Sequence, residues 1–117
     1  MITFYGYKKC GTSRKGEKFL NENNLDYTFI DITLSPPSRD QLEKIILQTE
    51  KPIKKFFNTS GVIYREMQLK DKLKFMSENE MIDLLASNGK LIKRPLLTNG
   101  DKSSVAFNEE EFNNIWH

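Results

Sequence analysis

The 117-residue sequence has one cysteine, one histidine and no long apolar run, and each shortage excludes a class of protein. A single cysteine, Cys10, cannot form an internal disulfide, so any redox chemistry needs a thiol from outside the chain. With only Cys10 and His117 as cysteine and histidine ligands, there is no metal site to predict, and structural zinc is excluded. No apolar stretch approaches the roughly 18 residues of a membrane span, so no membrane partner is expected.

Charges of one sign do not predominate either. The sequence has 18 basic and 16 acidic residues and a formal net charge of +2, which does not indicate direct binding to nucleic acid. Residues 1–9 place a few apolar residues before the lysines, the reverse of the order in a secretory signal. We therefore expect a cytoplasmic protein. Its length fits one domain over residues 1–117, and we expect a monomer.

The first third of the sequence predicts a βαβ unit. Residues 2–5 are β-branched or aromatic and are followed by Gly6, which indicates a short buried strand. Residues 12–23 are compatible with a helix, and residues 27–32 alternate as a second strand does. Two strands joined by a helix are expected to be parallel, with a right-handed connection.

The middle of the sequence is typical of helices. Residues 38–41 and 77–80 have the spacing of capping boxes, and apolar residues at helical spacing follow each of them. Asn88 and Gly89 predict a left-handed stop for the second of these helices. Residues 52–76 contain short apolar steps and a turn-like segment, and their pattern favours no particular element.

The end of the sequence predicts a β-hairpin and a last helix. Residues 95–98 and 104–107 have the composition of strands around a turn at residues 99–101, and Asn108 can cap the helix that follows. The whole order predicts an α/β fold with a mixed β-sheet. A helical insertion, about residues 38–88, separates the βαβ half from the β-hairpin-helix half.

Cys10 follows the first strand and immediately precedes a helix. The free N–H groups from Gly11 onward and the helix dipole favour the thiolate, and the hydroxyls of Thr12 and Ser13 can donate to it. Four nearby cations add to this field if they lie close, namely Lys8, Lys9, Arg14 and Lys15. A lone cysteine is more often a small buried hydrophobe. This position instead favours a nucleophile whose pKa lies below the usual value of about 8.5.

Spacing excludes two other uses of this loop. A phosphatase-type loop needs an arginine six residues after the cysteine, where this sequence has Gly16. A dithiol motif needs a second cysteine at position 13, where it has Ser13. The site is therefore monothiol.

Three segments carry a resemblance to a known family. Residues 10–14 (CGTSR), 36–42 (PPSRDQL) and 94–96 (RPL) are similar to the glutaredoxin-related arsenate reductase family, which is grouped with the Spx and MgsR regulators. The resemblance implies a thioredoxin-like fold with a helical insertion. It also implies a cis peptide bond at Pro95, which would place Arg94 beside Cys10.

The resemblance implies an activity as well. In family members that reduce arsenate, the cysteine attacks arsenic, a thiol such as glutathione joins, and glutaredoxin completes the cycle. Arg94 matches one of the three arginines that hold the oxyanion. The regions near Asn58 and Phe107 offer no arginine, although Arg65 lies at a neighbouring position. The segment 56–61 (FFNTSG) resembles a branch associated with glutathione-dependent thiol reduction.

The regulators of the family imply a different role. Spx-type proteins bind the α subunit of RNA polymerase and sense oxidation through a C-x-x-C pair, which Ser13 prevents here. Pro52 also stands in the stretch where their polymerase contact uses a glycine, so polymerase binding is disfavoured. We therefore expect a monothiol oxidoreductase without a bound cofactor, with glutathione or an equivalent small thiol as co-substrate and with glutaredoxin or thioredoxin as partners. Arsenate reductase, transcriptional regulator and inactive fold relic are the alternatives.

Overall fold

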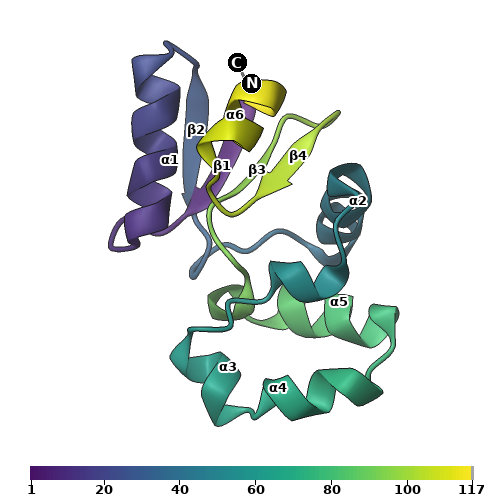
Figure 1. The fold of residues 1–117 in the computed structure, drawn as a ribbon. Coiled ribbons are helices and arrows are strands. Elements are labelled where there is room, and N and C mark those ends of the chain that lie inside the picture. Colours follow the sequence, from purple (N-terminus) through teal and green to yellow (C-terminus); the bar gives the residue numbers. More distant parts are fainter. Residues whose placement is uncertain (117) are drawn as a thin grey trace.

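The computed structural model describes residues 1–116, so His117 lies outside the described residues. The chain begins with a βαβ unit, continues through a run of helices and ends with a β-hairpin and a last helix, as the sequence pattern predicts; short 3-10 helices are labelled η (Figure 1). The elements are β1 (Ile2–Gly6), α1 (Gly11–Glu22), β2 (Tyr27–Asp31), α2 (Arg39–Thr49), η1 (Ile53–Phe56), α3 (Val62–Glu66), α4 (Leu69–Lys72), η2 (Leu73–Phe75), α5 (Glu78–Ser87), η3 (Gly89–Leu91), β3 (Leu96–Thr98), β4 (Ser103–Val105) and α6 (Glu109–Trp116).

The four strands form one mixed sheet in the order β2-β1-β3-β4. β1 and β2 run parallel, as expected when a helix connects them, whereas β1–β3 and β3–β4 are antiparallel. The helices from α2 to α5 all come between β2 and β3 in the sequence. The predicted α/β class, with a helical insertion between two halves of a mixed sheet, is confirmed.

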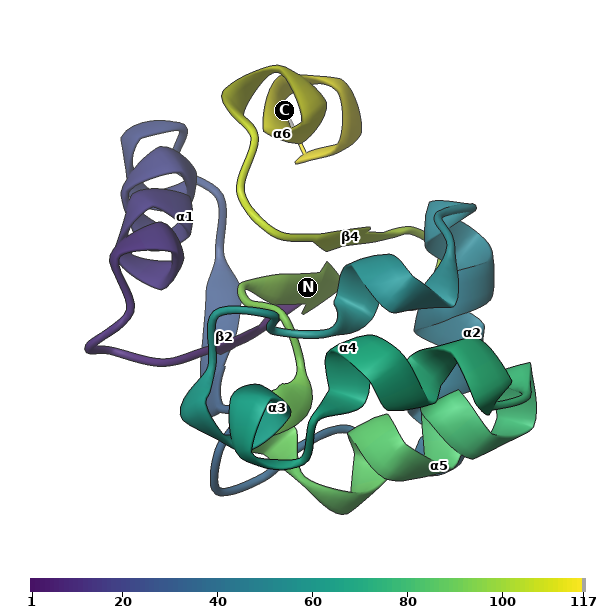
Figure 2. The same ribbon diagram turned by 60° about the horizontal axis from the view of Figure 1, so that its bottom comes forward.

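Strand alternation divides the core between the two faces of the sheet. Ile2 and Phe4 of β1 face α1 and α6, whereas Tyr5 faces the insertion. Figure 2 shows α1 and α6 on one side of the sheet, with α2 and α5 on the other. The first cluster contains Ile2, Phe4, Phe19, Leu20, Leu97, Phe112 and Trp116. The buried indole N–H of Trp116 donates to the Ser104 hydroxyl at 2.9 Å, so this cluster leaves that polar group satisfied.

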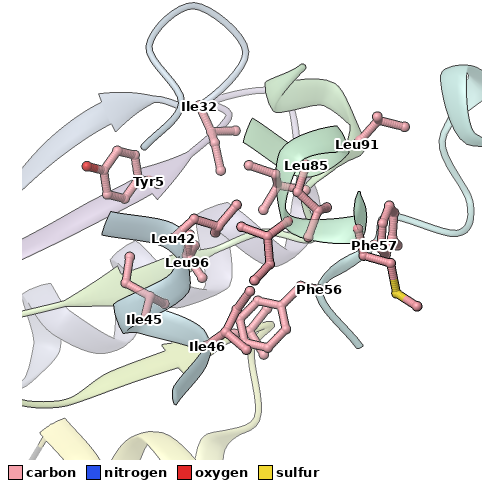
Figure 3. Close-up of a cluster of buried hydrophobic side chains, with 14 of the residues drawn as sticks. Tyr5, Ile32, Leu42, Ile45, Ile46, Phe56, Phe57, Leu85, Leu91 and Leu96 are labelled. Carbon is pink, nitrogen blue, oxygen red and sulfur yellow. The ribbon is translucent and has the colours of Figure 1, made fainter. Parts of the chain in front are cut away.

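The larger cluster joins the sheet to the insertion. Leu42 and Ile46 of α2 meet Leu85 of α5 and Phe56 of η1 beneath the sheet (Figure 3). Burying one such side chain contributes about 1.5 to 3 kcal/mol. The helices between β2 and β3 are therefore held against the sheet by the core itself.

Both predicted capping boxes are present. The Ser38 hydroxyl accepts the N–H of Gln41 at 3.2 Å, and the Gln41 side chain accepts the N–H of Ser38 at 3.0 Å. Ser77 and Glu80 make the same pair of bonds, each at 3.1 Å. These bonds satisfy N–H groups that the first turns of α2 and α5 would otherwise leave free.

The predicted left-handed stop at Asn88 and Gly89 is wrong. Asn88 has an extended backbone, with φ −155° and ψ 108°, and its side chain accepts the N–H of Lys90 at 2.9 Å. Gly89 starts η3 and is needed for space, because a Cβ atom there would overlap the carbonyl oxygen of Ile32. The glycine therefore permits a close approach of two backbones.

Two other boundaries differ from the prediction. β4 ends at Val105 because Ala106 has a φ of 66°, which a strand cannot continue. Residues 52–76, which showed no clear pattern, form short helical segments from η1 to η2. No helix in residues 1–116 combines the length and the apolar character needed to span a membrane.

Candidate active site

Cys10 lies where the loop after β1 enters α1. Its backbone is extended, with φ −89° and ψ 125°, and its carbonyl accepts the N–H of Arg14 at 3.1 Å. The N–H of Cys10 donates to the carbonyl of Tyr7 at 2.9 Å and closes the loop. Cys10 is therefore the N-cap residue of α1, at the helix end whose N–H groups and dipole favour negative charge.

The neighbouring hydrogen-bond donors lower the pKa of Cys10. Partial burial raises the pKa, but the Thr12 hydroxyl, the backbone and hydroxyl of Ser13, and the N–H of Thr12 together lower it to about 7. Ser13 is fully buried, and its hydroxyl oxygen accepts the N–H of Tyr7 at 3.1 Å, which fixes its position. Near pH 7, about half of the Cys10 population is thiolate.

The Thr12 hydroxyl links Cys10 to the loop before β3. Its oxygen lies 3.0 Å from the Cys10 sulfur and 3.1 Å from the Arg94 carbonyl oxygen. One hydroxyl has one hydrogen to donate. In the thiol form the S–H donates to Thr12, which donates onward to Arg94. In the thiolate form the hydroxyl turns to the sulfur, and the Arg94 carbonyl is released as an acceptor.

The four cations near Cys10 in the sequence are not what lowers its pKa. The Lys8 ammonium lies 2.9 Å from a carboxylate oxygen of Glu17 and 4.1 Å from the ring centre of Phe29. Arg14 is exposed on α1 and does not line the cavity at Cys10. Of this group only Lys15 lines that cavity. The groups that lower the pKa are hydroxyls and backbone N–H groups.

Cys10 opens into a cavity of about 600 Å³ between α1, the insertion and the loop before β3. Its lining residues are Cys10, Gly11, Thr12, Lys15, Asn58, Ser60, Gly61, Val62, Lys93 and Arg94. Of the residues predicted for the site, the structure brings Gly11, Thr12 and Arg94 to the cavity with Cys10. Ser13 lies beneath it as a buried support.

Arg94 lines the cavity wall opposite α1, whereas Pro95, the other residue predicted for this loop, is not among the lining residues. The peptide bond between them is cis, which confirms what the family resemblance implied. The Arg94 guanidinium lies 5.2 Å from the ring centre of Tyr7, and its buried Nε–H has no hydrogen-bond partner in residues 1–116. An unsatisfied buried donor is costly. The Arg94 guanidinium forms no ion pair with any residue in 1–116, so its charge is available to an anion in the cavity.

Sequence reasoning missed part of this wall. Lys93 and Asn58 reach the cavity because residues 56–58 pair with residues 91–93: the N–H of Asn58 donates to Leu91, and that of Lys93 to Phe56, both at 2.7 Å. The only signal for Lys93 in the sequence was its position directly before the RPL segment. Arg65 is exposed on α3 and does not line the cavity.

The arrangement combines a nucleophile with an anion-binding wall. A partly ionised thiol at a helix N-terminus can attack sulfur or an oxyanion, and Lys15, Lys93 and Arg94 can hold negative charge beside it. The part of the chain that the structure describes contains no group of three or more His, Cys, Asp or Glu side chains placed to hold a metal ion.

A mixed sheet of this order, with a cysteine at the start of α1 and a cis-proline directly before β3, defines a thioredoxin-like fold. The chain belongs to the ArsC family, whose model matches residues 5–115, and the resemblance to the ArsC, Spx and MgsR group is confirmed.

Similarity extends over nearly the whole chain. The Bacillus subtilis protein YusI is 50% identical over 98% of each chain. A solved structure of an ArsC family related protein from Bacteroides fragilis aligns with a TM-score of 0.94 and 44% identity, covering 97% of this chain and 95% of that one. The global transcriptional regulator Spx of Streptococcus mutans is 28% identical over 95% of this chain and 80% of its own length. These relatives extend the family assignment over nearly the whole chain.

Proposed function

We propose that this protein is a monothiol reductase in which the Cys10 thiolate forms a mixed disulfide with a low-molecular-weight thiol or a protein. The observation that carries the proposal is the lowered pKa of Cys10, about 7, at the mouth of an open cavity. Lys15, Lys93 and Arg94 line the same cavity and would bind the anionic part of a substrate. Gly11, Thr12 and Ser13 would stabilise the thiolate.

The cycle consists of two thiol–disulfide exchanges. The Cys10 thiolate attacks one sulfur of a substrate disulfide, bonds to it and expels the other half as a thiolate, which takes a proton from water. A second thiol, such as glutathione, then attacks the mixed disulfide and restores the Cys10 thiolate. Ser13 provides no resolving sulfur, so the second thiol must come from outside, and glutaredoxin or thioredoxin would reduce the product.

Alkylation of Cys10 by iodoacetamide tests the proposal. The rate should rise with pH as the thiol ionises and reach half its maximum near pH 7, against about 8.5 for a free cysteine. At pH 6 a larger fraction of Cys10 than of free cysteine is thiolate, but the Cys10 thiolate is the weaker base and hence the weaker nucleophile. The first effect is larger, so Cys10 should react about fivefold faster than free cysteine. The rate is measured by mass spectrometry, with Cys10→Ser as the unlabelled control. A rate at pH 6 equal to that of free cysteine contradicts the proposal.

Arsenate reduction is the second function, favoured by family membership and by the Arg94 cation at the cavity wall. Cys10 and a small thiol would together supply the two electrons that convert arsenate to arsenite and would end as a mixed disulfide. With glutathione or bacillithiol and glutaredoxin present, arsenite should form. Arg94→Gln should lower kcat/KM about 10- to 100-fold, because one charge-assisted hydrogen bond contributes about 1.5 to 3 kcal/mol. Arsenite production no higher than with Cys10→Ser excludes this function.

A regulatory role is the alternative from another class, and the similarity to Spx favours it. Such a protein would dock on the α subunit of RNA polymerase through the end of α2, where Pro52 follows Lys51. A pull-down with the isolated α C-terminal domain decides between the two classes. A clear complex there would replace the reductase proposal.

A further inference from the structure

A second cavity of about 680 Å³ adjoins the one at Cys10. Lys93 lines both cavities, and in the segment 58–60 Thr59 lines the second while its neighbours Asn58 and Ser60 line the first. Phe57 and Ile92 form an antiparallel β-bridge, which lies next to Asn58 and Lys93, where the two cavities meet. The two cavities therefore adjoin at Lys93 and at residues 58–60, and Cys10 lines only the first.

The walls of this double cavity are basic although the whole chain is nearly neutral. The six charged residues that line it are Lys15, Lys51, Lys54, Lys55, Lys93 and Arg94, and neither lining contains a carboxylate. The chain as a whole has 18 basic and 16 acidic residues, so this concentration is not a consequence of composition. A concave surface with one sign of charge attracts ligands of the opposite sign.

Most of these cations are free to bind a ligand. The Lys51 ammonium is held by Glu111 at 2.8 Å, whereas Lys54, Lys55 and Lys93 make no ion pair with any residue in 1–116. Lys54 and Lys55 are exposed beside Phe56, whose fully buried ring anchors η1 in the core. The two ammonium groups are thus presented from a fixed backbone.

The cavity beside these lysines also has an apolar surface and a considerable volume. Pro52, Phe57, Val105 and Ala106 line it. A pocket of a few hundred Å³ already accommodates a small ligand. Two adjoining cavities of about 600 and 680 Å³ exceed what one small thiol needs, and an apolar surface with lysines around it fits a polypeptide segment with carboxylate side chains.

We infer that the partner of Cys10 is an acidic polypeptide segment that carries a cysteine. This inference rests on the proposed thiol exchange at Cys10. The partner's cysteine lies in the first cavity, and its neighbouring Asp or Glu side chains bind Lys93, Lys54 and Lys55 in the second. The Cys10 thiolate attacks the partner's sulfur in a disulfide between the partner and a small thiol. A Cys10–partner disulfide forms, and the small thiol leaves as a thiolate that takes a proton from water.

Three peptides test the inference. Each has one cysteine as its 2-pyridyl disulfide, flanked on both sides by Glu, by Ser or by Lys, and attack by Cys10 releases pyridine-2-thione, which is followed by absorbance. At low ionic strength and pH 7.5 the acidic peptide should react about tenfold faster than the Ser peptide, and the Lys peptide more slowly than both. The preference should shrink in 0.5 M salt, where the Debye length falls to a few ångströms. The 2-pyridyl disulfide of glutathione serves as a small anionic comparison.

Matched variants locate the effect. Lys54→Gln/Lys55→Gln should reduce the rate with the acidic peptide about three- to tenfold and leave the Ser peptide and iodoacetamide rates unchanged. Lys70→Gln/Lys72→Gln makes the same change in net charge at exposed residues of α4 that line neither cavity, and it should retain the preference.

The outcomes separate this inference from the function on which it rests. If Cys10 reacts with the Ser peptide no faster than free cysteine, the reductase proposal fails. If the Ser peptide reacts rapidly but the acidic peptide reacts no faster, the function stands and the acidic partner is excluded. If the glutathione disulfide reacts as fast as the acidic peptide and is equally sensitive to the Lys54 and Lys55 changes, the groove serves a small anionic thiol and the polypeptide partner is overturned.

Discussion

Gly89→Ala is expected to lower the free energy of unfolding by about 3 kcal/mol or more. The new Cβ atom would overlap the carbonyl oxygen of Ile32 and lie 2.8 Å from its carbonyl carbon. Both are backbone atoms, so the clash cannot be relieved by a side-chain rotation. Overpacking in a core typically costs about 1 to 3 kcal/mol, and this contact falls at the upper end or beyond.

The effect should reach the candidate site as well. Gly89 starts η3, which ends at Leu91, and the carbonyl of Leu91 accepts the N–H of Asn58 at 2.7 Å. Lys93 and Arg94 follow two and three residues after Leu91. A displacement of η3 away from Ile32 would therefore move the residues that form the wall opposite Cys10.

Urea unfolding, followed by tryptophan fluorescence or circular dichroism, measures the change. Gly11→Ala is the matched control, because a Cβ at Gly11 would meet no atom within 4 Å and alanine is favoured over glycine in a helix. The free energy of unfolding of Gly11→Ala should lie within about 1 kcal/mol of that of the wild type. An equally small change for Gly89→Ala would show that the backbone contact with Ile32 is looser than its geometry indicates.

Gly89 also marks the limit of what the sequence could predict. The capping boxes at Ser38 and Ser77 were predictable because all their atoms lie within four consecutive residues. The reason for Gly89 lies at Ile32, more than 50 residues earlier, and no local pattern reports it. At the end of a helical pattern, an asparagine or glycine typically indicates a left-handed stop, so the local rule predicted the wrong role for Gly89.

The same division applies to the site. The position of Cys10 was predictable, because a short strand, a loop and a helix follow one another within a few residues. The donors that lower its pKa were predictable too, because Thr12 and Ser13 follow Cys10 at the start of the same helix. The small part of the cations was not predictable: Lys8 lies two residues before Cys10, but the fold directs its ammonium to Glu17 and Phe29. The basic groove could not be predicted from the sequence, because it depends on tertiary structure. Residues 56–58 pair with residues 91–93, and this pairing brings Lys93 next to the cavity.

Thr12→Val is expected to raise the pKa of Cys10 by about one unit. Valine keeps the branched shape of threonine but has no hydroxyl to donate to the thiolate, and the Thr12 hydroxyl is the largest of the effects that lower this pKa. A hydrogen bond to a charged group contributes about 1.5 to 3 kcal/mol, or roughly one to two pKa units, and the lower value applies because the sulfur is partly exposed.

The consequence is a loss of reactivity near neutral pH. With a pKa of about 7 the wild type is half ionised at pH 7, whereas Thr12→Val would be about one-tenth ionised there. The pH at which iodoacetamide alkylation is half-maximal should move upward by about one unit, and the rates should converge above pH 9. Because raising the pH restores the thiolate in the variant, this convergence distinguishes a changed pKa from a blocked cavity.

Thr12→Ser provides the control that assigns the effect to the hydroxyl. Serine retains the donor and loses only the methyl group, so its half-maximal pH should stay near that of the wild type. A serine variant that shifts as far as the valine variant would assign the effect to the methyl group and to its packing against the loop. A valine variant that remains near pH 7 would mean that the backbone N–H groups of α1 and the Ser13 hydroxyl set the pKa of Cys10 without Thr12.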